Sequence, residues 1–314
     1  MPDLKAILQL TRFPNVFTAV SNIAAAYLLT HTDLSDWPTF VLLVLSSSLL
    51  YLAGMVLNDV FDVAKDTAER PMRPIPSGRV PLEFAKRLGF GLLAGGVTLG
   101  WMVSALHDTP TPGLVATLLA AAVVLYDGPL KSTPLAPAAM GLCRFLNILL
   151  GLSLAATGVF NWHPMHWLVA LGVGVYITGV TLFARTEAQA SSGQLMLLCG
   201  TIIMLCGIGL LGYFPRWADE MLPLGSGIRD QVLKSIFWPM MWGFFGFFTV
   251  RRCVPAIVDP TPMLVQIAVK QAIFAIVIFD AALVTATHIP IPYSLVIASL
   301  LVPMYLLGRS IYST

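Results

Sequence analysis

Four oxygen-bearing side chains stand close together in the segment NDVFDVAKDTAERPMRPIPSGRV, which runs from Asn58 to Val80. Asp59, Asp62 and Asp66 are three and four residues apart, so a continuing helix would place them on one face. Asn58 precedes Asp62 by four residues and adds an amide oxygen to that face. Like charges on one helical stripe repel each other unless a cation lies among them. Oxygen ligands without Cys or His favour a hard cation, and we predict a Mg²⁺ site here.

Basic residues follow the acidic ones in the same segment. Arg70, Arg73 and Arg79 lie in a stretch whose prolines at 71, 74 and 76 end the helix and stiffen the loop. Guanidinium groups bind phosphate through paired hydrogen bonds. Carboxylates and arginines together therefore indicate a diphosphate or polyphosphate ligand bridged by Mg²⁺. The alternative is a solvated loop at a membrane edge, which explains the arginines but not the ordered carboxylates.

The composition requires a membrane around these residues. Hydrophobic residues make up 57% of the 314 positions and charged residues only 11%, and the mean hydropathy is +0.82. A soluble domain carries roughly a quarter charged residues. Disordered, collagen-like and nucleic-acid-binding proteins need a polar bias, a glycine repeat or a basic surface. What remains is an integral membrane protein in contact with the lipid bilayer.

Apolar stretches of roughly 17–25 residues predict about ten spanning helices. The span at 235–250 is the weakest, because it is short and aromatic, and nine spans remain if it lies in the interface. We expect an all-α integral membrane protein that forms a single domain over residues 1–314. The predicted spans are 14–31, 38–60, 83–106, 113–130, 137–158, 165–187, 193–214, 235–250, 263–286 and 292–312.

Lysine and arginine predict the orientation. With ten spans and the N-terminus inside, nearly all basic residues outside the spans fall on the cytoplasmic side. The outer segments hold only Arg216, Arg229 and Lys234. The acidic and basic segment at 58–80 then lies on the cytoplasmic side.

The pattern N-D-x-x-D-x-x-x-D followed by R-P-x-R-P-I-P-S-G-R resembles the first aspartate-rich motif of the UbiA superfamily of intramembrane prenyltransferases. It follows the second span, as it does in that family, and extends over more than twenty residues. Weaker similarities run along much of the first two-thirds of the chain. They comprise Arg12, Pro14 and Asn15 near the first helix, Tyr126, Pro129, Leu130 and Lys131 in a Y-x-x-P-L-K element, and Gly141, Arg144 and Asn147 on the fifth helix.

The resemblance implies a helical bundle around a central apolar cavity with a cytoplasmic mouth. The family transfers an isoprenoid chain from an allylic diphosphate to an acceptor that is often aromatic. By this resemblance Asn58 and Asp62 would bind Mg²⁺, with Asp59 and Asp66 in support. Asp62, Asp66 and Glu187 are the candidate catalytic residues. The candidate diphosphate contacts are Arg70, Arg73, Arg79, Lys131, Arg144 and Arg185, and the candidate cavity and acceptor residues are Asn15, Tyr126 and Asn147.

The second aspartate-rich motif departs from the family pattern D-T-x-Y-A-x-x-D-x-x-D. The corresponding stretch is VTLFARTEAQASS, in which Val180 replaces the first aspartate and Ala190 the last. Glu187 can stand for the middle one, and Arg185 lies nearby. Two explanations compete: Arg185 supplies positive charge in a one-metal site, or the diphosphate chemistry is weakened or lost.

Three function classes follow. We expect Mg²⁺-dependent transfer of a prenyl group from an isoprenyl diphosphate to a small acceptor, aromatic or other. The alternative is a non-catalytic prenyl-lipid-binding or transport-associated protein on the same scaffold. A secondary transporter is disfavoured, because the charges cluster at one face instead of the midplane. The chain is most similar to a divergent branch found in bacterial operons of the Ebo type, which implies a bacterial cytoplasmic (inner) membrane.

Two further carboxylates have less specific interpretations. Asp280 lies deep in the ninth predicted span, where a carboxylate is costly. Its partner is either Lys270 on the same helix or a residue on another helix. Asp127 is four residues before Lys131, and the default expectation is an ion pair between the two; the alternative is a structural role in the site.

Overall fold

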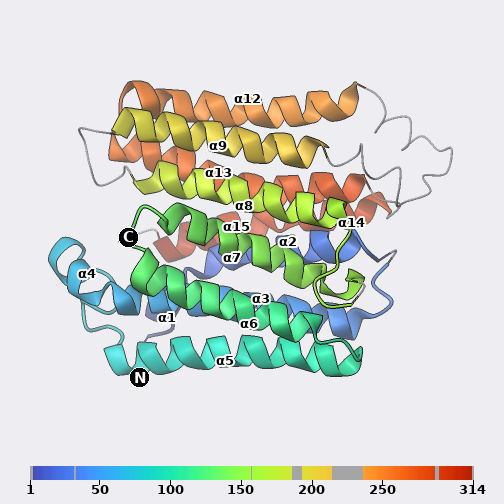
Figure 1. Cartoon of the computed structure of the whole chain (residues 1–314). Coiled ribbons are helices and arrows are strands. Elements are labelled where there is room, and N and C mark those ends of the chain that lie inside the picture. The colour runs from blue at the N-terminus through green and yellow to red at the C-terminus, as the bar shows by residue number, and fades with distance from the viewer. Residues whose placement is uncertain are drawn as a thin grey trace.

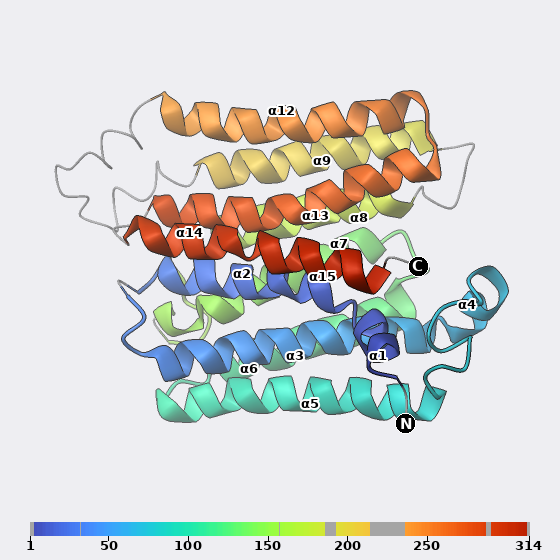
Figure 2. The same cartoon turned by 180° about the vertical axis from the view of Figure 1, so that it is seen from behind.

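The computed structural model describes residues 3–31, 33–156, 158–185, 193–213, 236–286 and 290–312. Throughout these ranges the regular structure is helical. The long helices run side by side in one bundle, with α5 (Leu82–Leu106) at one edge and α12 (Phe237–Val258) at the other (Figure 1 and Figure 2). The prediction of an all-α fold is confirmed.

In chain order the helices fall into two groups, one before and one after the turn at 126–130. The first group comprises α1 (Leu4–Leu10), α2 (Val16–Leu28), α3 (Trp37–Phe61), α4 (Val63–Glu69), α5 and α6 (Thr111–Leu125). The second comprises α7 (Ala136–Gly151), α8 (Pro164–Ala184), α9 (Gly193–Tyr213), α12, α13 (Pro262–Thr285), α14 (Ile291–Ser299) and α15 (Leu301–Tyr312). Short turns lie between α1 and α2 at η1 (Phe13–Asn15), between α6 and α7 at η2 (Tyr126–Leu130), and between α7 and α8 at η3 (Ser153–Ala155).

Ten apolar segments were predicted, and each corresponds to helix in the described ranges. Seven are long and apolar enough to cross a membrane, counting α6 with η2 and α14 with α15 as one span each. The other three are α2 with 13 residues, α7 with 16 and α12 with 22. The weak eighth segment is a complete helix that packs against α9 and α13. The chain is therefore an integral membrane protein whose helices form one bundle.

Side-chain caps and prolines mark where several of these helices begin. Asp36 accepts a hydrogen bond from the backbone N–H of Thr39 at 3.4 Å, and Thr261 accepts one from Leu264 at 3.4 Å. A proline follows at the first or second position of both helices. This order satisfies backbone donors that the helix itself leaves unpaired.

A ring of helices surrounds the middle of the bundle. Helix α13, late in the chain, packs against α2 near its start, and α2 also contacts α3 and α7. Figures 1 and 2 show α5, α9 and α12 outside this inner group. The ring therefore joins helices that are far apart in sequence.

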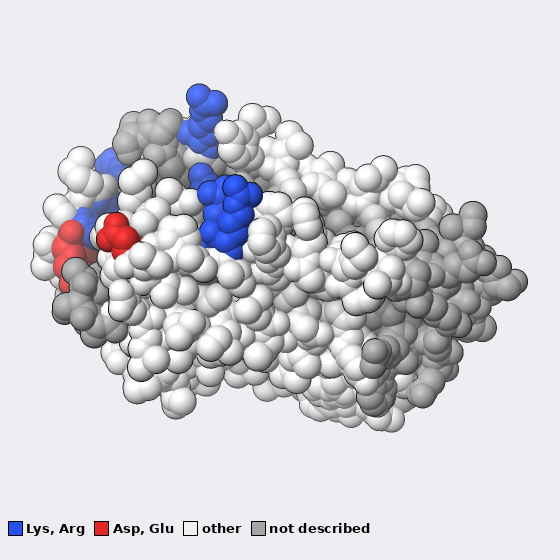
Figure 3. Space-filling view, turned by 90° about the horizontal axis from the view of Figure 1, so that it is seen from above, with Lys and Arg blue, Asp and Glu red and all other residues white. Residues whose placement is uncertain are grey.

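Charge gathers at one end of the bundle. Helix α4 and both termini lie at that end (Figure 1). On the face shown in Figure 3, basic and acidic side chains lie in the left part of the view, the side of α4, and the described surface elsewhere is uncharged. The bundle thus has one polar end and a long apolar body.

Candidate active site

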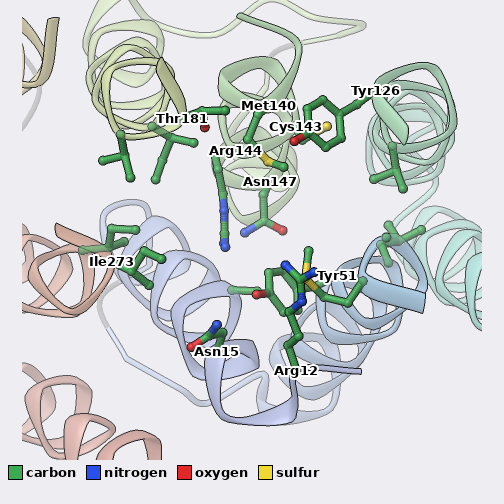
Figure 4. A pocket seen from close by; sticks show the side chains of 18 of the residues that line it. Arg12, Asn15, Tyr51, Tyr126, Met140, Cys143, Arg144, Asn147, Thr181 and Ile273 are labelled. Carbon is green, nitrogen blue, oxygen red and sulfur yellow. The ribbon is translucent and has the colours of Figure 1, made fainter. Parts of the chain in front are cut away.

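A cavity of about 260 Å³ lies within the ring of helices. Side chains from η1, α2, α3, α6, η2, α7, α8 and α13 line it, so both ends of the chain contribute (Figure 4). Most of its wall is apolar. Its polar lining comprises Arg12, Asn15, Ser47, Tyr51, Tyr126, Asp127, Arg144, Asn147 and Thr181. Such an arrangement suits a ligand with an apolar chain and a polar head.

Arg12 enters the cavity from the break between α1 and η1. Its backbone is left-handed, with φ 45° and ψ 45°, a conformation that non-glycine residues adopt rarely and often at functional sites. Pro14 then starts the next turn. The Arg12 Nη2 donates to Asp59 Oδ1 at 3.3 Å. The turn therefore joins the start of the chain to the acidic segment.

The acidic stripe is not carried by one continuous helix, which corrects the sequence prediction. Helix α3 ends at Phe61, and Asp62 is the residue shared between it and α4. Asp59 therefore belongs to α3 and Asp66 to α4. Among the described residues no group of three His, Cys, Asp or Glu side chains is arranged to hold a metal ion.

Cations of the chain itself lie between the carboxylates. Arg73 Nη1 is 3.1 Å from Asp59 Oδ1 and 2.6 Å from Asp66 Oδ2. Lys131 pairs with Asp62. Asp59 and Asp66 are 5% and 2% exposed, so their charges are held in a largely desolvated place where unpaired carboxylates would be costly. The loop and the acidic segment form one ion-pair network.

Asp127 holds Asn58 in place. The Asn58 Nδ2 donates to Asp127 Oδ1 at 2.8 Å, while Asp127 Oδ2 is buried with no hydrogen-bond partner in the described structure. Because Lys131 pairs with Asp62, the expected ion pair between Asp127 and Lys131 is absent from the ion pairs of the described residues. The amide donation leaves the Asn58 oxygen as the group able to ligate a cation.

A wide π-helical turn makes this placement possible. It covers Tyr126–Leu130 and contains Pro129, which has no backbone N–H to donate. Turns of this kind often occur at functional sites. Within this turn Tyr126 and Asp127 both line the cavity.

Arg144 of α7 points toward the middle of the cavity, across from Asn15 and Tyr51 (Figure 4). Its Nη2 donates to Thr18 Oγ1 at 3.0 Å and its Nη1 to Asn22 Oδ1 at 3.4 Å. Its guanidinium carbon lies 5.0 Å from the centre of the Tyr51 ring, a cation–π arrangement. Helices α2 and α3 thus fix the direction of this cation.

The carboxylate of Asp280 supports the Arg144 guanidinium indirectly, through Asn22. It is fully buried, and its Oδ2 accepts from Ser21 Oγ at 2.6 Å and from Asn22 Nδ2 at 2.8 Å. Of the two partners considered from sequence, the one on another helix is correct, because Lys270 lies over the Phe274 ring instead. Asp280 therefore orients the amide that accepts from Arg144.

The three residues expected at the acceptor end all line the cavity. They are Asn15, Tyr126 and Asn147. Ser47 Oγ donates to Asn147 Oδ1 at 2.6 Å, and Asn147 Nδ2 is buried with no partner among the described residues. A donor without a partner at a cavity wall is available to a ligand.

Five of the six predicted basic residues are not among the residues that line the cavity. Two of the five, Arg73 and Lys131, pair with carboxylates of the acidic segment. Arg79 donates to Gln9 Oε1 at 2.7 Å and to the Met72 carbonyl at 2.9 Å, so it folds the loop onto α1. Arg70 and Arg185 are exposed. Arg79 therefore stabilises the loop against α1. Arg70 and Arg185 lie on the surface of the protein.

The described part of the degenerate second motif, up to Arg185, reaches the cavity through α8. Val180, Thr181 and Ala184 line the wall. An aspartate is expected by family resemblance at the position of Val180, so an apolar side chain occupies a wall position there. Glu187 lies outside the described residues.

The donor set of the first motif fits Mg²⁺ chemically. Asn58, Asp62, Asp66 and Asp127 offer oxygen ligands only, which a hard cation prefers. The partnerless oxygen of Asp127 and the partial exposure of Asp62, whose side chain is 23% accessible, leave ligating atoms within reach. Asp59, Asp62 and Asp66 are at the same time ion-paired with Arg12, Arg73 or Lys131.

Sequence reasoning expected an ion pair with Lys131 for Asp127, passed over Tyr51 and named Arg12 only by resemblance. Asp127 sits in a predicted span beside a glycine and a proline, and an acidic residue so placed is a signal for a functional group. Tyr51 is four residues before Met55 and seven before Asn58, so helical spacing alone places it on the motif's face. Arg12 needed the fold, because its partner Asp59 is 47 residues away.

Comparisons with known proteins agree with this geometry. The UbiA prenyltransferase family matches residues 19–218. A digeranylgeranylglyceryl phosphate synthase of Metallosphaera sedula is 29% identical over 185 residues, which cover 58% of this chain and 60% of that protein. The synthase of Methanoregula boonei is 45% identical over 95 residues, covering 30% of this chain and 32% of its own. The matched stretches thus span less than two-thirds of these relatives.

Solved structures share the fold over nearly the whole chain. A UbiA homologue of Archaeoglobus fulgidus, bound to DMAPP and Mg²⁺, superposes with a TM-score of 0.62 at 14% identity and covers 93% of this chain and 99% of that one. A digeranylgeranylglyceryl phosphate synthase gives 0.60 at 20% identity, with 90% and 98% covered. The family match covers more than half of the sequence, and the chain belongs to the UbiA prenyltransferase family.

Proposed function

We propose that this protein transfers a prenyl group from an isoprenyl diphosphate to a small acceptor within the membrane, in a reaction that depends on Mg²⁺. The observation that carries the proposal is that Arg12 and Asp127 line the apolar cavity and also hydrogen-bond to Asp59 and Asn58 of the acidic segment. Relatives are named as prenyl-transferring synthases, and homologous structures hold DMAPP or GPP with Mg²⁺.

Local charge explains why a metal is needed. The network holds four carboxylates and three cations: Asp59, Asp62, Asp66 and Asp127 beside Arg12, Arg73 and Lys131. A diphosphate adds further negative charge, which this nearly balanced network does not offset by itself. Asn58 and Asp62 would hold Mg²⁺, with Asp66 and Asp127 beside them. Once bound, the ion would offset charge on the departing diphosphate.

The residues of the chain then perform the remaining tasks. Arg12, Arg73 and Lys131 donate hydrogen bonds to the diphosphate as the carbon–oxygen bond breaks. The apolar wall keeps water from the allylic cation. An acceptor atom attacks that carbon, and its proton passes to a nearby base. Asp66 and Glu187 are the candidates for that base.

Asp59 has a different proposed part. It is held by Arg12 and Arg73 at 3.3 and 3.1 Å, so it positions the two cations. We assign Arg144, Asn147, Asn15 and Tyr126 to the acceptor end of the cavity. The protein would lie in the cytoplasmic membrane as one domain, with its polar end toward the cytoplasm.

Labelled geranyl diphosphate tests the activity in proteoliposomes of the full chain. We expect Mg²⁺-dependent release of diphosphate, and loss of more than 100-fold in Asp62→Ala. Glu83→Gln removes an exposed carboxylate near the same end and should keep the wild-type rate. Release by Asp62→Ala at the wild-type rate would overturn the metal assignment.

A non-catalytic lipid-binding protein on the same scaffold is the second candidate. The observation that favours it is that the motif carboxylates are paired with cations of the chain, while Val180 replaces an aspartate of the second motif. Mass spectrometry of lipid copurified with the protein distinguishes the two. An unmodified isoprenoid bound without turnover would support the binding role.

A further inference from the structure

A second hollow lies on the outer side of the bundle, between α12 and α13. It measures about 240 Å³, and we call it the α12–α13 groove. We propose that it binds an anionic phospholipid, with one acyl chain in the groove and the headgroup against Arg251, Arg252 and Lys270. This inference concerns a site separate from the prenyl-transfer cavity and does not depend on the proposed activity.

The groove has a buried floor and an open rim. Cys253, Ala268, Ala272 and Phe279 are between 2% and 7% exposed and form its floor. At the rim, Phe244 is 58% and Ile278 is 39% exposed. The opening therefore faces the surroundings of the bundle, which in a membrane are acyl chains.

Sequence explains why the hollow exists. Ala268, Ala272 and Ala275 stand at helical spacing along α13 and are too small to fill the space up to α12. Phenylalanines of α12 flank that space, and the rings of Phe244 and Phe248 are in contact at a tilt of 59°, with their centres 4.4 Å apart. Rigid rings beside small residues make a slot suited to a flexible apolar chain.

The groove and the main cavity are on different faces of α13. Val269, Ile273 and Ile276 line the main cavity, whereas Ala268, Ala272 and Ala275 line the groove. No residue is shared between the two linings in the described structure. The groove is therefore not the tail end of the prenyl-binding site.

Charge complementarity identifies the occupant. Arg252 lines the groove, and Arg251 precedes it. Lys270 precedes the lining residue Gln271 in the sequence. Its Nζ is 5.9 Å from the centre of the Phe274 ring, which also lines the groove. All three cations are exposed, and the ion pairs of the described residues include none of them.

A phosphate headgroup would complete this arrangement. Basic side chains near a membrane surface attract anionic lipids, and arginine binds phosphate through paired hydrogen bonds. Basic side chains are present in the left part of Figure 3, toward the α4 end of the bundle, and uncharged surface continues beyond them. The anionic headgroup of a phospholipid would lie against the basic side chains, and its acyl chain would lie along the groove.

Native mass spectrometry of the full-length protein in detergent tests this, with phosphatidylglycerol and phosphatidylcholine as probes. We expect wild type to retain phosphatidylglycerol preferentially. Arg252→Gln and Lys270→Gln should each weaken that binding about fivefold. Arg309→Gln removes an exposed arginine of α15 outside the groove and should leave it unchanged.

A second variant fills the groove. Ala275→Leu adds apolar volume without changing charge and should reduce binding of both lipids. A melting temperature near that of wild type shows that this variant is folded. Lys270→Gln changes an exposed side chain and tests the same site independently.

Several results would overturn the proposal. These are equal retention of the two lipids, an equal loss in Arg309→Gln, or unchanged retention in folded Ala275→Leu. Displacement of phosphatidylglycerol by geranyl diphosphate would make the groove part of the substrate site. A dimer that Ala275→Leu dissociates would make it a protein interface.

Discussion

Asp127 illustrates how single residues determine this site. It accepts from the Asn58 amide at 2.8 Å, and this contact orients the Asn58 oxygen. Removing such a supporting contact from a metal-binding residue typically lowers affinity or activity 10–100-fold, roughly. We therefore expect Asp127→Leu to raise the Mg²⁺ concentration needed for half-maximal diphosphate release by about 10-fold or more.

Asp127→Asn is the matched control for this prediction. It keeps an oxygen acceptor for Asn58 and should shift the Mg²⁺ requirement less than Asp127→Leu. The measurement is a Mg²⁺ titration of diphosphate release at saturating prenyl diphosphate. A change in maximal rate with an unchanged Mg²⁺ requirement would contradict this role.

The sequence predicted which residues form the site, but it did not predict which of their side chains pair with one another. The spacing of Asp59, Asp62 and Asp66 indicated a cation site from sequence alone. The position of α3's end determines two pairings. Arg73 lies between Asp59 and Asp66, and Lys131 pairs with Asp62 instead of Asp127. The backbone departs from helical values at Asp62, with φ −85° and ψ 2°, and no local signal in the sequence marks that departure.

Helix α7 carries Arg144 and Asn147, so its distance from α8 controls the cavity. A Cβ placed on Gly141 would lie 2.1 Å from Thr178 Oγ1 and 2.5 Å from the Gly174 carbonyl oxygen. Backbone cannot yield as a flexible side chain does. We expect Gly141→Ala to cost about 1–3 kcal/mol and to weaken prenyl diphosphate binding.

Gly209→Ala provides the control, because a Cβ there meets nothing within 4 Å. Thermal melts in detergent would compare the two variants. Equal melting temperatures for Gly141→Ala and wild type would show that α7 and α8 are not held at this distance.

Helices α2 and α13 are joined by the buried Asp280. Replacing it with Ala leaves the Ser21 hydroxyl and the Asn22 amide without their acceptor, which costs about 1–3 kcal/mol for each buried polar group. We expect Asp280→Ala to lower the melting temperature by several degrees. Asp280→Asn keeps one oxygen acceptor and should lower it less, and the reverse order would contradict this account.

The positions of the helices could be predicted largely from sequence, because membrane spans need long apolar stretches. Their lengths were less predictable: α2 is shorter than its predicted span, and the last span is divided into α14 and α15. The contact between α2 and α13 joins residues about 260 positions apart, such as Ser21 and Asp280. Hydropathy carries no information about such pairings.

The whole molecule has a polar end and an apolar body, and the excess of basic residues predicts that the polar end faces the cytoplasm. Single cysteines test this orientation in intact cells. Thr109→Cys, between α5 and α6, should react with a membrane-impermeant thiol reagent, whereas Ser77→Cys should react only after lysis. The background requires replacement of the four native cysteines. The opposite labelling pattern would place the polar end outside.

The central claim is that the acidic segment binds Mg²⁺ together with a prenyl diphosphate. Isothermal titration of the purified protein with a non-reactive geranyl thiodiphosphate, with and without Mg²⁺, tests it directly. The account predicts tight binding only with the metal, and loss of that dependence in Asp62→Ala. Equal binding without Mg²⁺ in the wild-type protein would contradict it.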